Sequence, residues 1–166
     1  MKNKNYLYGL LLYGFIAGFT SPVSAEIRQC DKEFISSDDS RIVYMGRLSR
    51  SIPHIVRFTY PGVSILANFE GTSLQMKAKP GSGAFMVEVD DELPYRINFA
   101  ENDSIQTLAE GLPEGTHRVR IMYAIEGYEL KPAFKGFYLD KGCRLDEAPV
   151  LPERRIEFIG NSITCG

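Results

Sequence analysis

Apolar and polar residues alternate along most of this chain, from Arg41 to Leu139. A repeat of two places neighbouring side chains on opposite faces of an extended strand, whereas an amphipathic helix repeats its apolar residues every three to four positions. The positions that this alternation directs inward are Val56, Phe58, Tyr60, Leu74, Met76, Ala78, Phe85, Val87, Val89, Tyr95, Ile97, Phe99, Val119, Ile121 and Tyr123. The pattern therefore predicts half-buried antiparallel strands with no long helix between them.

Residues that favour turns separate these strands at short intervals. The separators are Pro61-Gly62, Pro80-Gly81-Ser82-Gly83, Asp90-Asp91, Gly111-Leu112-Pro113-Glu114-Gly115 and Glu126-Gly127. About eight to ten short strands result, and each sheet needs a second sheet to bury its apolar face. We therefore predict an all-β fold, an antiparallel β-sandwich of jelly-roll type over residues 26–145. An immunoglobulin-like strand order is the alternative.

The composition excludes several classes of protein. The 19 Lys and Arg residues face 21 Asp and Glu residues, so the chain lacks the basic excess that nucleic-acid binding requires. With 44% hydrophobic residues the chain can build a core, which argues against disorder. Its two histidines and three cysteines have no close pairing, so the sequence carries no zinc motif. We expect no cofactor and no nucleic-acid partner.

Residues 1–25 have the organisation of a secretory signal peptide. Lys2 and Lys4 precede an uncharged run from Tyr6 to Phe19, and Val23-Ser24-Ala25 supplies a small-residue cleavage pattern. The alternative is a membrane anchor, but the run is shorter than the roughly 20 residues that span a bilayer. We expect export to the periplasm, the cell surface or the medium, with no transmembrane segment in the mature chain.

Export would place the three cysteines in a compartment that permits disulfides. Cys30 opens the mature domain and Cys143 ends its β-rich part, and the first and last strands of a sandwich are often neighbours. This predicts a Cys30–Cys143 bridge, and the alternative is that both are small buried hydrophobic residues. We assign no catalytic role to the third cysteine, Cys165.

The pattern changes after Leu139. Residues 146–153 contain two prolines and have the composition of a linker, and Ile156-Glu157-Phe158-Ile159 forms a short apolar run. This run leads into Gly160-Asn161-Ser162, and several α/β hydrolases present a nucleophilic serine on a strand that ends in Gly-x-Ser. We expect residues 154–166 to begin a second domain of α/β type, truncated after its first strand.

The stretch from Arg155 to Gly166 resembles the first conserved block of the SGNH (GDSL-like) hydrolases. Its residues are similar to those of carbohydrate esterase family 2. Upstream segments resemble the N-terminal jelly roll of that family, namely Phe58–Ile65, Ala67–Thr72, Val87–Asp90 and Gly115–Val119. The resemblance implies deacetylation of acetylated plant polysaccharides such as xylan or glucomannan. It also implies that Ser162 is the nucleophile and that its own backbone N–H donates to the oxyanion. Asn161 stands where the wider superfamily has Asp, so the resemblance to a generic lipase is weaker.

In that family the catalytic histidine, and the Gly and Asn that complete the oxyanion hole, lie far downstream of the serine. A serine hydroxyl is a weak nucleophile without a base. The resemblance therefore implies that this chain is the N-terminal part of an esterase and is inactive by itself. The alternative function is a non-catalytic β-sandwich that binds carbohydrate or another partner.

Three further groups of residues have both a functional and a structural interpretation. His54 or His117 could serve Ser162 as base, but surface or core positions are commoner for histidine. The acidic run from Asp90 to Glu92 could bind calcium, although a solvated turn explains it better. Five tyrosines could stack on sugar rings, although we expect core packing first, and they are Tyr60, Tyr95, Tyr123, Tyr128 and Tyr138.

Overall fold

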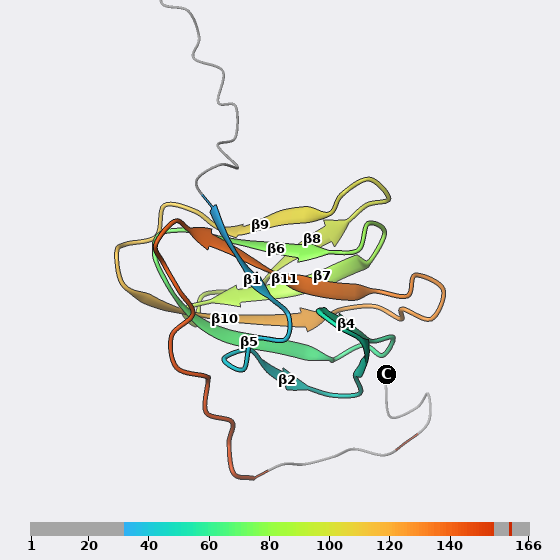
Figure 1. Cartoon of the computed structure of the whole chain (residues 1–166). Helices are drawn as coiled ribbons and strands as arrows, with labels where there is room; N and C mark the ends of the chain where they lie inside the picture. The colour runs from blue at the N-terminus through green and yellow to red at the C-terminus, as the bar shows by residue number, and fades with distance from the viewer. Residues whose placement is uncertain (1–31, 155–159, 161–166) are drawn as a thin grey trace, which may run out of the picture.

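The computed structural model describes residues 32–154 and residue 160. This part of the chain forms eleven strands, arranged in two sheets that face each other (Figure 1). The strands are β1 (Lys32–Ser36), β2 (Val43–Met45), β3 (Ser49–Ile52), β4 (Ile55–Arg57), β5 (Ser64–Glu70), β6 (Leu74–Ala78), β7 (Gly83–Val89), β8 (Tyr95–Phe99), β9 (Ile105–Ala109), β10 (Thr116–Tyr123) and β11 (Ala133–Asp140). The expected all-β class is confirmed, and the described residues contain no helix that could cross a bilayer.

The order of the strands is that of a jelly roll. One sheet has the order β3-β4-β11-β6-β9, with β1 added beside β11, and the other has the order β2-β5-β10-β7-β8. The eight strands from β4 to β11 pair from the two ends of this stretch toward its middle. β4 pairs with β11, β5 with β10, β6 with β9 and β7 with β8. This is the pairing of one long hairpin wrapped around a core. The predicted jelly roll is therefore confirmed over the immunoglobulin-like order.

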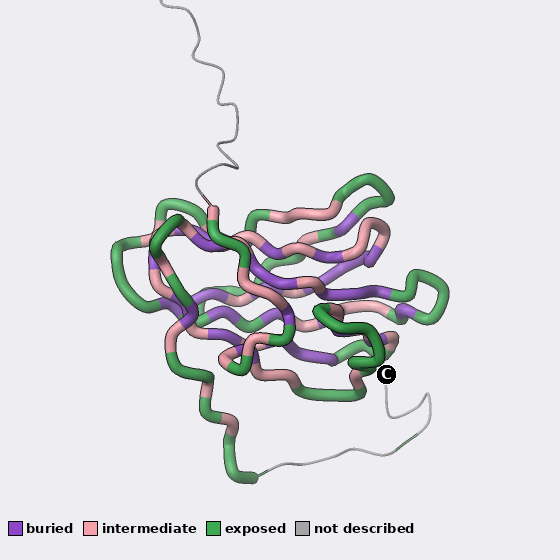
Figure 2. Tube along the Cα trace, in the orientation of Figure 1, coloured by how far each residue is buried: buried purple, intermediate pink, exposed green. Residues whose placement is uncertain are grey.

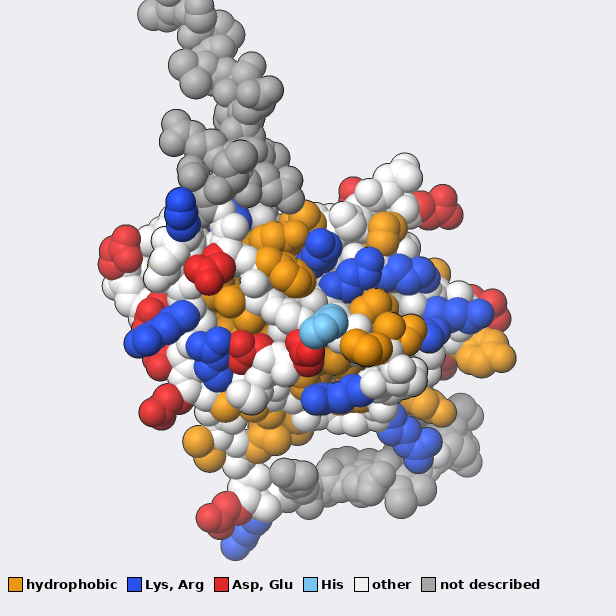
Figure 3. All heavy atoms as spheres, in the orientation of Figure 1, with side chains coloured by type: hydrophobic (Ala, Val, Ile, Leu, Met, Phe, Trp, Pro, Cys, Tyr) orange, Lys and Arg blue, Asp and Glu red, His pale blue; other side chains and the backbone are white. Residues whose placement is uncertain are grey.

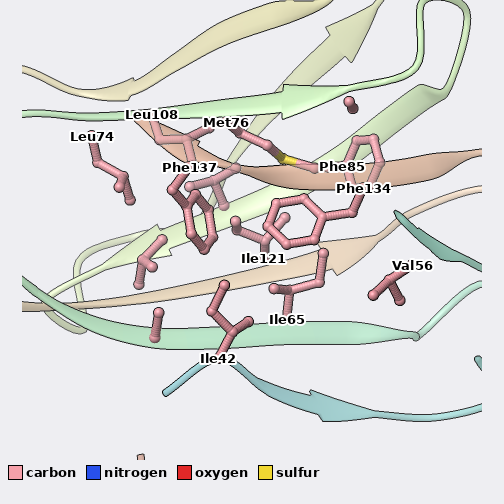
Figure 4. Close-up of a cluster of buried hydrophobic side chains, with 14 of the residues drawn as sticks. Ile42, Val56, Ile65, Leu74, Met76, Phe85, Leu108, Ile121, Phe134 and Phe137 are labelled. Carbon is pink, nitrogen blue, oxygen red and sulfur yellow. The ribbon is translucent and has the colours of Figure 1, made fainter. Parts of the chain in front are cut away.

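The core lies between the two sheets and consists of the side chains that the alternation directs inward (Figures 2 and 4). Leu74 and Met76 from one sheet and Phe85 and Ile121 from the other belong to this one cluster, and all four are fully buried. Burying side chains of this size contributes about 1.5–3 kcal/mol each. The predicted inward positions are therefore mostly correct.

Two of those positions are not core positions. Tyr60 is 55% exposed because it lies three residues beyond the end of β4, where the chain bends into the turn at Pro61-Gly62. Tyr95 is 39% exposed because it opens β8, the edge strand of the five-stranded sheet. Alternation indicates the facing of a residue only while the strand continues.

A polar cluster at the end of β11 holds β1 in place. The Asp140 carboxylate accepts from Lys32 Nζ at 2.6 Å and from Ser73 Oγ at 2.7 Å, and the Thr72 N–H and hydroxyl each donate to it at 3.1 Å. Partial burial alone would raise the pKa of Asp140, but these donors outweigh it and lower the pKa to about 2. The cluster joins β1, β11 and the β5–β6 turn.

Candidate functional site

The residues to which the sequence assigns catalysis lie outside the described part of the chain. The predicted catalytic residue is Ser162, and its neighbour Asn161, the apolar run Ile156–Ile159 and the non-catalytic Cys165 lie outside that part as well. The signal peptide, residues 1–25, and Cys30 also lie outside it, so these predictions stay predictions. The structure does describe the path by which the chain leaves the sandwich toward Ser162.

That path begins with a segment fixed to β5. Leu145 is buried and forms an isolated bridge with Phe69. The Asp146 N–H donates to Asn68 O at 2.9 Å, and Asn68 Nδ2 returns a bond to Glu147 O at 2.9 Å. The start of the predicted linker is therefore held against the five-stranded sheet by both main-chain and side-chain bonds.

Beyond this anchor, residues 149–152 run over the outer face of the same sheet (Figure 1). They enclose a groove of about 530 Å³ together with Met45 and Leu66. The charged part of its wall consists of Glu88, Asp91, Arg118 and Arg120. A chain that continues to the Gly-Asn-Ser block thus departs from this side of the sandwich.

His117 is buried at the start of β10, where the alternation placed it, and only 8% of it is exposed. Its Nδ1 lies 2.6 Å from Asp90 Oδ2, its Nε2 lies 2.8 Å from Pro113 O, and its ring packs against Phe69. Burial opposes the charged ring, but the bonds to Pro113 and Asp90 outweigh this and raise the pKa of His117. Since both ring nitrogens are engaged, neither can accept a proton from a serine hydroxyl, and His117 has a structural role.

His54 contacts an acid and a serine of its own neighbourhood through one ring nitrogen. It lies exposed in the β3–β4 turn with a φ of 60°. Its Nδ1 lies 2.7 Å from Asp38 Oδ2 and 3.3 Å from Ser36 Oγ. A serine–histidine–acid relay uses opposite ring nitrogens for the serine and the acid, so Ser36, His54 and Asp38 do not form such a relay.

The acidic turn after β7 binds side chains and backbone of β10. Asp90 and Asp91 have φ values of 52° and 63°, and the Glu92 N–H donates to Val89 O at 3.0 Å, which is the geometry of a type I′ turn. Asp90 accepts from His117 and from the Arg118 N–H, and Asp91 pairs with the Arg118 guanidinium. The tight turn was predicted. Among the described residues no cluster of three acidic, histidine or cysteine side chains could hold a metal ion.

The expectation that the tyrosines are core residues is wrong for four of the five. Only Tyr123 is buried; Tyr60, Tyr95 and Tyr128 are exposed, and Tyr138 is half-buried. Tyr138 faces outward because its neighbours Phe137 and Leu139 occupy the inward positions of β11.

Tyr138 forms an aromatic pair with Phe34, a residue that the sequence reasoning did not single out. The ring centroids lie 5.0 Å apart, and Phe34 is 43% exposed. Lys77 Nζ lies 3.1 Å from the Tyr138 hydroxyl and 5.1 Å from the Phe34 ring centroid. Lys32, Phe34 and Ser36 are alternate residues of β1 and share its outward face. This alternation is the local signal that could have predicted an outward-facing ring at Phe34.

Strand register extends this pair into a row across the outer face of the six-stranded sheet. Phe34 lies opposite Tyr138, Tyr138 opposite Gln75, and Gln75 opposite Thr107. Gln75 Nε2 donates to the Thr107 hydroxyl at 3.4 Å. This face therefore presents two aromatic rings beside amide, hydroxyl and ammonium groups, and it lies on the opposite sheet from the linker.

Residues 44–149 match the family model described as Carbohydrate esterase 2 N-terminal. A curated relative, the acetylxylan esterase / glucomannan deacetylase of Cellvibrio japonicus (strain Ueda107), is 31% identical over 134 residues. The aligned part covers 80% of this chain and 37% of that relative.

Solved structures that share the fold include two family two carbohydrate esterases. A family two carbohydrate esterase from Cellvibrio japonicus has a TM-score of 0.71 and 29% identity, covering 81% of this chain and 41% of that one. A family two carbohydrate esterase from Clostridium thermocellum, solved in complex with cellohexaose, has a TM-score of 0.63 and 34% identity, covering 75% and 38%. The chain thus spans less than half the length of these proteins.

Proposed function

Because the chain belongs to carbohydrate esterase family 2, whose N-terminal domain it contains, we propose that it begins a secreted serine esterase that deacetylates plant polysaccharides such as xylan and glucomannan. The resemblance drawn from the sequence is confirmed for the family and for the fold of the sandwich. The match over residues 44–149 carries the proposal, since it ends just before the segment that leads to Gly160-Asn161-Ser162.

In this proposal Ser162 attacks the acetyl carbonyl, and its own N–H stabilises the negative charge that develops on the oxygen. Loss of the sugar hydroxyl leaves an acetyl-enzyme, which water hydrolyses. As the family resemblance implies, the base comes from the remainder of a longer protein, and both ring nitrogens of His117 are already engaged. The sandwich acts as the support from which the anchored linker delivers the first strand of the catalytic domain.

The experiment is to express the full open reading frame and to measure acetate released from acetylated xylan and glucomannan. We expect release that falls to background in Ser162→Ala and persists in Ser51→Ala, a matched change at an exposed serine of β3. The 166-residue chain alone should release no acetate above background. Activity that survives Ser162→Ala, or Ser162-dependent turnover by the 166-residue chain, would contradict the proposal.

The aromatic pair favours a second candidate function, which is glycan binding by the outer face of the six-stranded sheet. Aromatic rings stack on the apolar faces of sugars, and the row from Phe34 to Thr107 sets polar groups beside them. This function predicts that the chain is retarded in a gel containing xylan or glucomannan. Phe34→Ala should abolish the retardation, and Tyr128→Ala, which removes an exposed ring elsewhere, should not.

A further inference from the structure

A second concave site lies at the end of the sandwich, apart from both the linker groove and the aromatic pair. It is a cleft of about 380 Å³ between the segment that leads into β3, the end of β4 and the β10–β11 loop. Its polar and charged lining consists of Arg47, Ser49, Arg57, Thr59, Tyr60 and Lys131. A cleft of this volume is within the range that binds small molecules.

The charge of this cleft is entirely positive. Arg47, Arg57 and Lys131 line it, no acidic residue does, and none of the three forms a salt bridge with an acid in the described part of the chain. Lys and Arg side chains also gather over the side of the six-stranded sheet where β11 begins (Figure 3). Three like charges around one hollow repel each other, and an anion in the hollow relieves this repulsion.

The guanidinium of Arg47 is held in position by its surroundings, and the loop that carries Lys131 is fixed through its backbone. The Arg47 guanidinium lies over the Tyr60 ring, with its Cζ 5.5 Å from the ring centroid. Lys131 has a φ of 49°, and its N–H donates to Gly127 O at 2.8 Å. Lys79 Nζ fixes the same loop by donating to Leu130 O at 2.5 Å. A guanidinium that is already oriented suits a planar carboxylate, to which it can donate two parallel hydrogen bonds.

We propose that this cationic cleft binds a carboxylate-bearing pyranose, that is, a uronic acid residue carried by the polysaccharide. The negative charge of the ligand follows from the cleft alone. The choice of a sugar rests on the proposed function, and the exposed Tyr60 ring and the hydroxyls of Ser49 and Thr59 suit a pyranose. The site would hold acidic side groups of a glycan away from the sheet face that carries the linker.

The test is titration of the 166-residue chain with D-glucuronate, followed by calorimetry or NMR. D-glucose is the neutral comparison because it differs only at C6, and inorganic phosphate is the comparison for a simple anion. We expect binding of glucuronate that weakens as salt is added, and no binding of glucose. Arg47→Gln and Lys131→Gln should each weaken glucuronate binding by about tenfold or more.

The matched control is Arg96→Gln, which removes the same charge from β8 on the other sheet and should leave glucuronate binding unchanged. Thermal unfolding of each variant verifies that it is folded. Equal binding of glucose and glucuronate, equal binding of phosphate, or unchanged binding in both cleft variants would overturn the proposal. Acetate release by the full-length protein is measured separately, so a failure of the cleft and a failure of the esterase assignment can be told apart.

Discussion

At the scale of single residues, His117 shows that a histidine considered as a catalytic base can have a structural role. Its two nitrogens bind Asp90 and Pro113, which belong to the turns after β7 and before β10. Since Pro113 O can only accept and the Asp90 carboxylate is an acceptor, both contacts are best satisfied by the doubly protonated ring. The charge on His117 therefore helps to hold two turns at one end of the sandwich.

This assignment predicts how stability depends on pH. The pKa of His117 is raised on folding, so its contribution is complete below the ordinary histidine value near 6.5 and is lost as pH rises through the higher folded value. The pKa of Asp90 is lowered, so its contribution is lost only as pH falls below about 3.8. We expect the free energy of unfolding in urea to fall as pH rises from about 6 to 8. His117→Gln should flatten this slope and His54→Gln should not; an unchanged slope in His117→Gln would contradict the assignment.

At the scale of elements, β11 is the strand on which the six-stranded sheet depends. It pairs with β6 along one edge and with β1 and β4 along the other, and a bulge interrupts its register between Phe134 and Gly136. The bulge keeps Phe134 and Phe137 in the core although they are three residues apart. A Cβ at Gly136 would lie 2.1 Å from Ile35 O and 2.9 Å from the Phe34 ring. Glycine is therefore what lets β1 and its aromatic ring approach β11.

Gly136→Ala should destabilise the fold by at least about 2 kcal/mol, because it combines a φ of +143° with a backbone clash. Gly62→Ala is the matched control, since Gly62 also has a positive φ, +82°, but no atom lies within 4 Å of its Cβ position. The control should lose about 1 kcal/mol from backbone strain alone. Equal losses in urea unfolding would show that the close approach of β1 contributes nothing.

At the scale of the whole molecule, the first and last described strands are neighbours. Lys32 lies opposite Asp140 in this pair of strands, and Cys143 follows Asp140 by three residues, after a turn at Lys141 and Gly142. Cys143 Sγ packs against Gly71, 2.8 Å from where a Cβ would lie, and burial raises the pKa of its thiol. Cys143 is a free cysteine in the described part of the chain and Cys30 lies outside it, so the Cys30–Cys143 bridge, which would close a loop around the entire sandwich, stays a prediction.

A bridge across a loop of this length should stabilise the fold by about 4–5 kcal/mol in the chain-entropy estimate. We expect non-reducing peptide mapping of the exported protein to recover Cys30 and Cys143 in one linked fragment, and reduction to lower the unfolding temperature. Cys143→Ser should abolish the effect of reductant, whereas Cys165→Ser should not. Alkylation of Cys143 in the denatured, unreduced protein would disprove the bridge.

Much of the sandwich could be predicted because its signal is local. Alternation located Leu74, Met76 and Ile121 in the core, and the glycines, prolines and aspartates marked the turns. The same reasoning failed at Tyr60 and Tyr95, because the end of β4 and the edge position of β8 depend on which strands pair. Alternation assigns a residue to a face, but pairing decides whether anything covers that face.

The sequence by itself determined the strands and the side chains that face inward. It also determined the esterase family, through the Gly160-Asn161-Ser162 block and the segments upstream of it. Each of these results depends on residues that are close together in the chain. Only the tertiary structure decided which distant residues meet. Strand pairing placed Phe34 beside Tyr138, joined His117 to Asp90 and brought Arg47, Arg57 and Lys131 around one cleft. Such contacts arise when the hairpin closes and its register is set, and no local pattern specifies that closure.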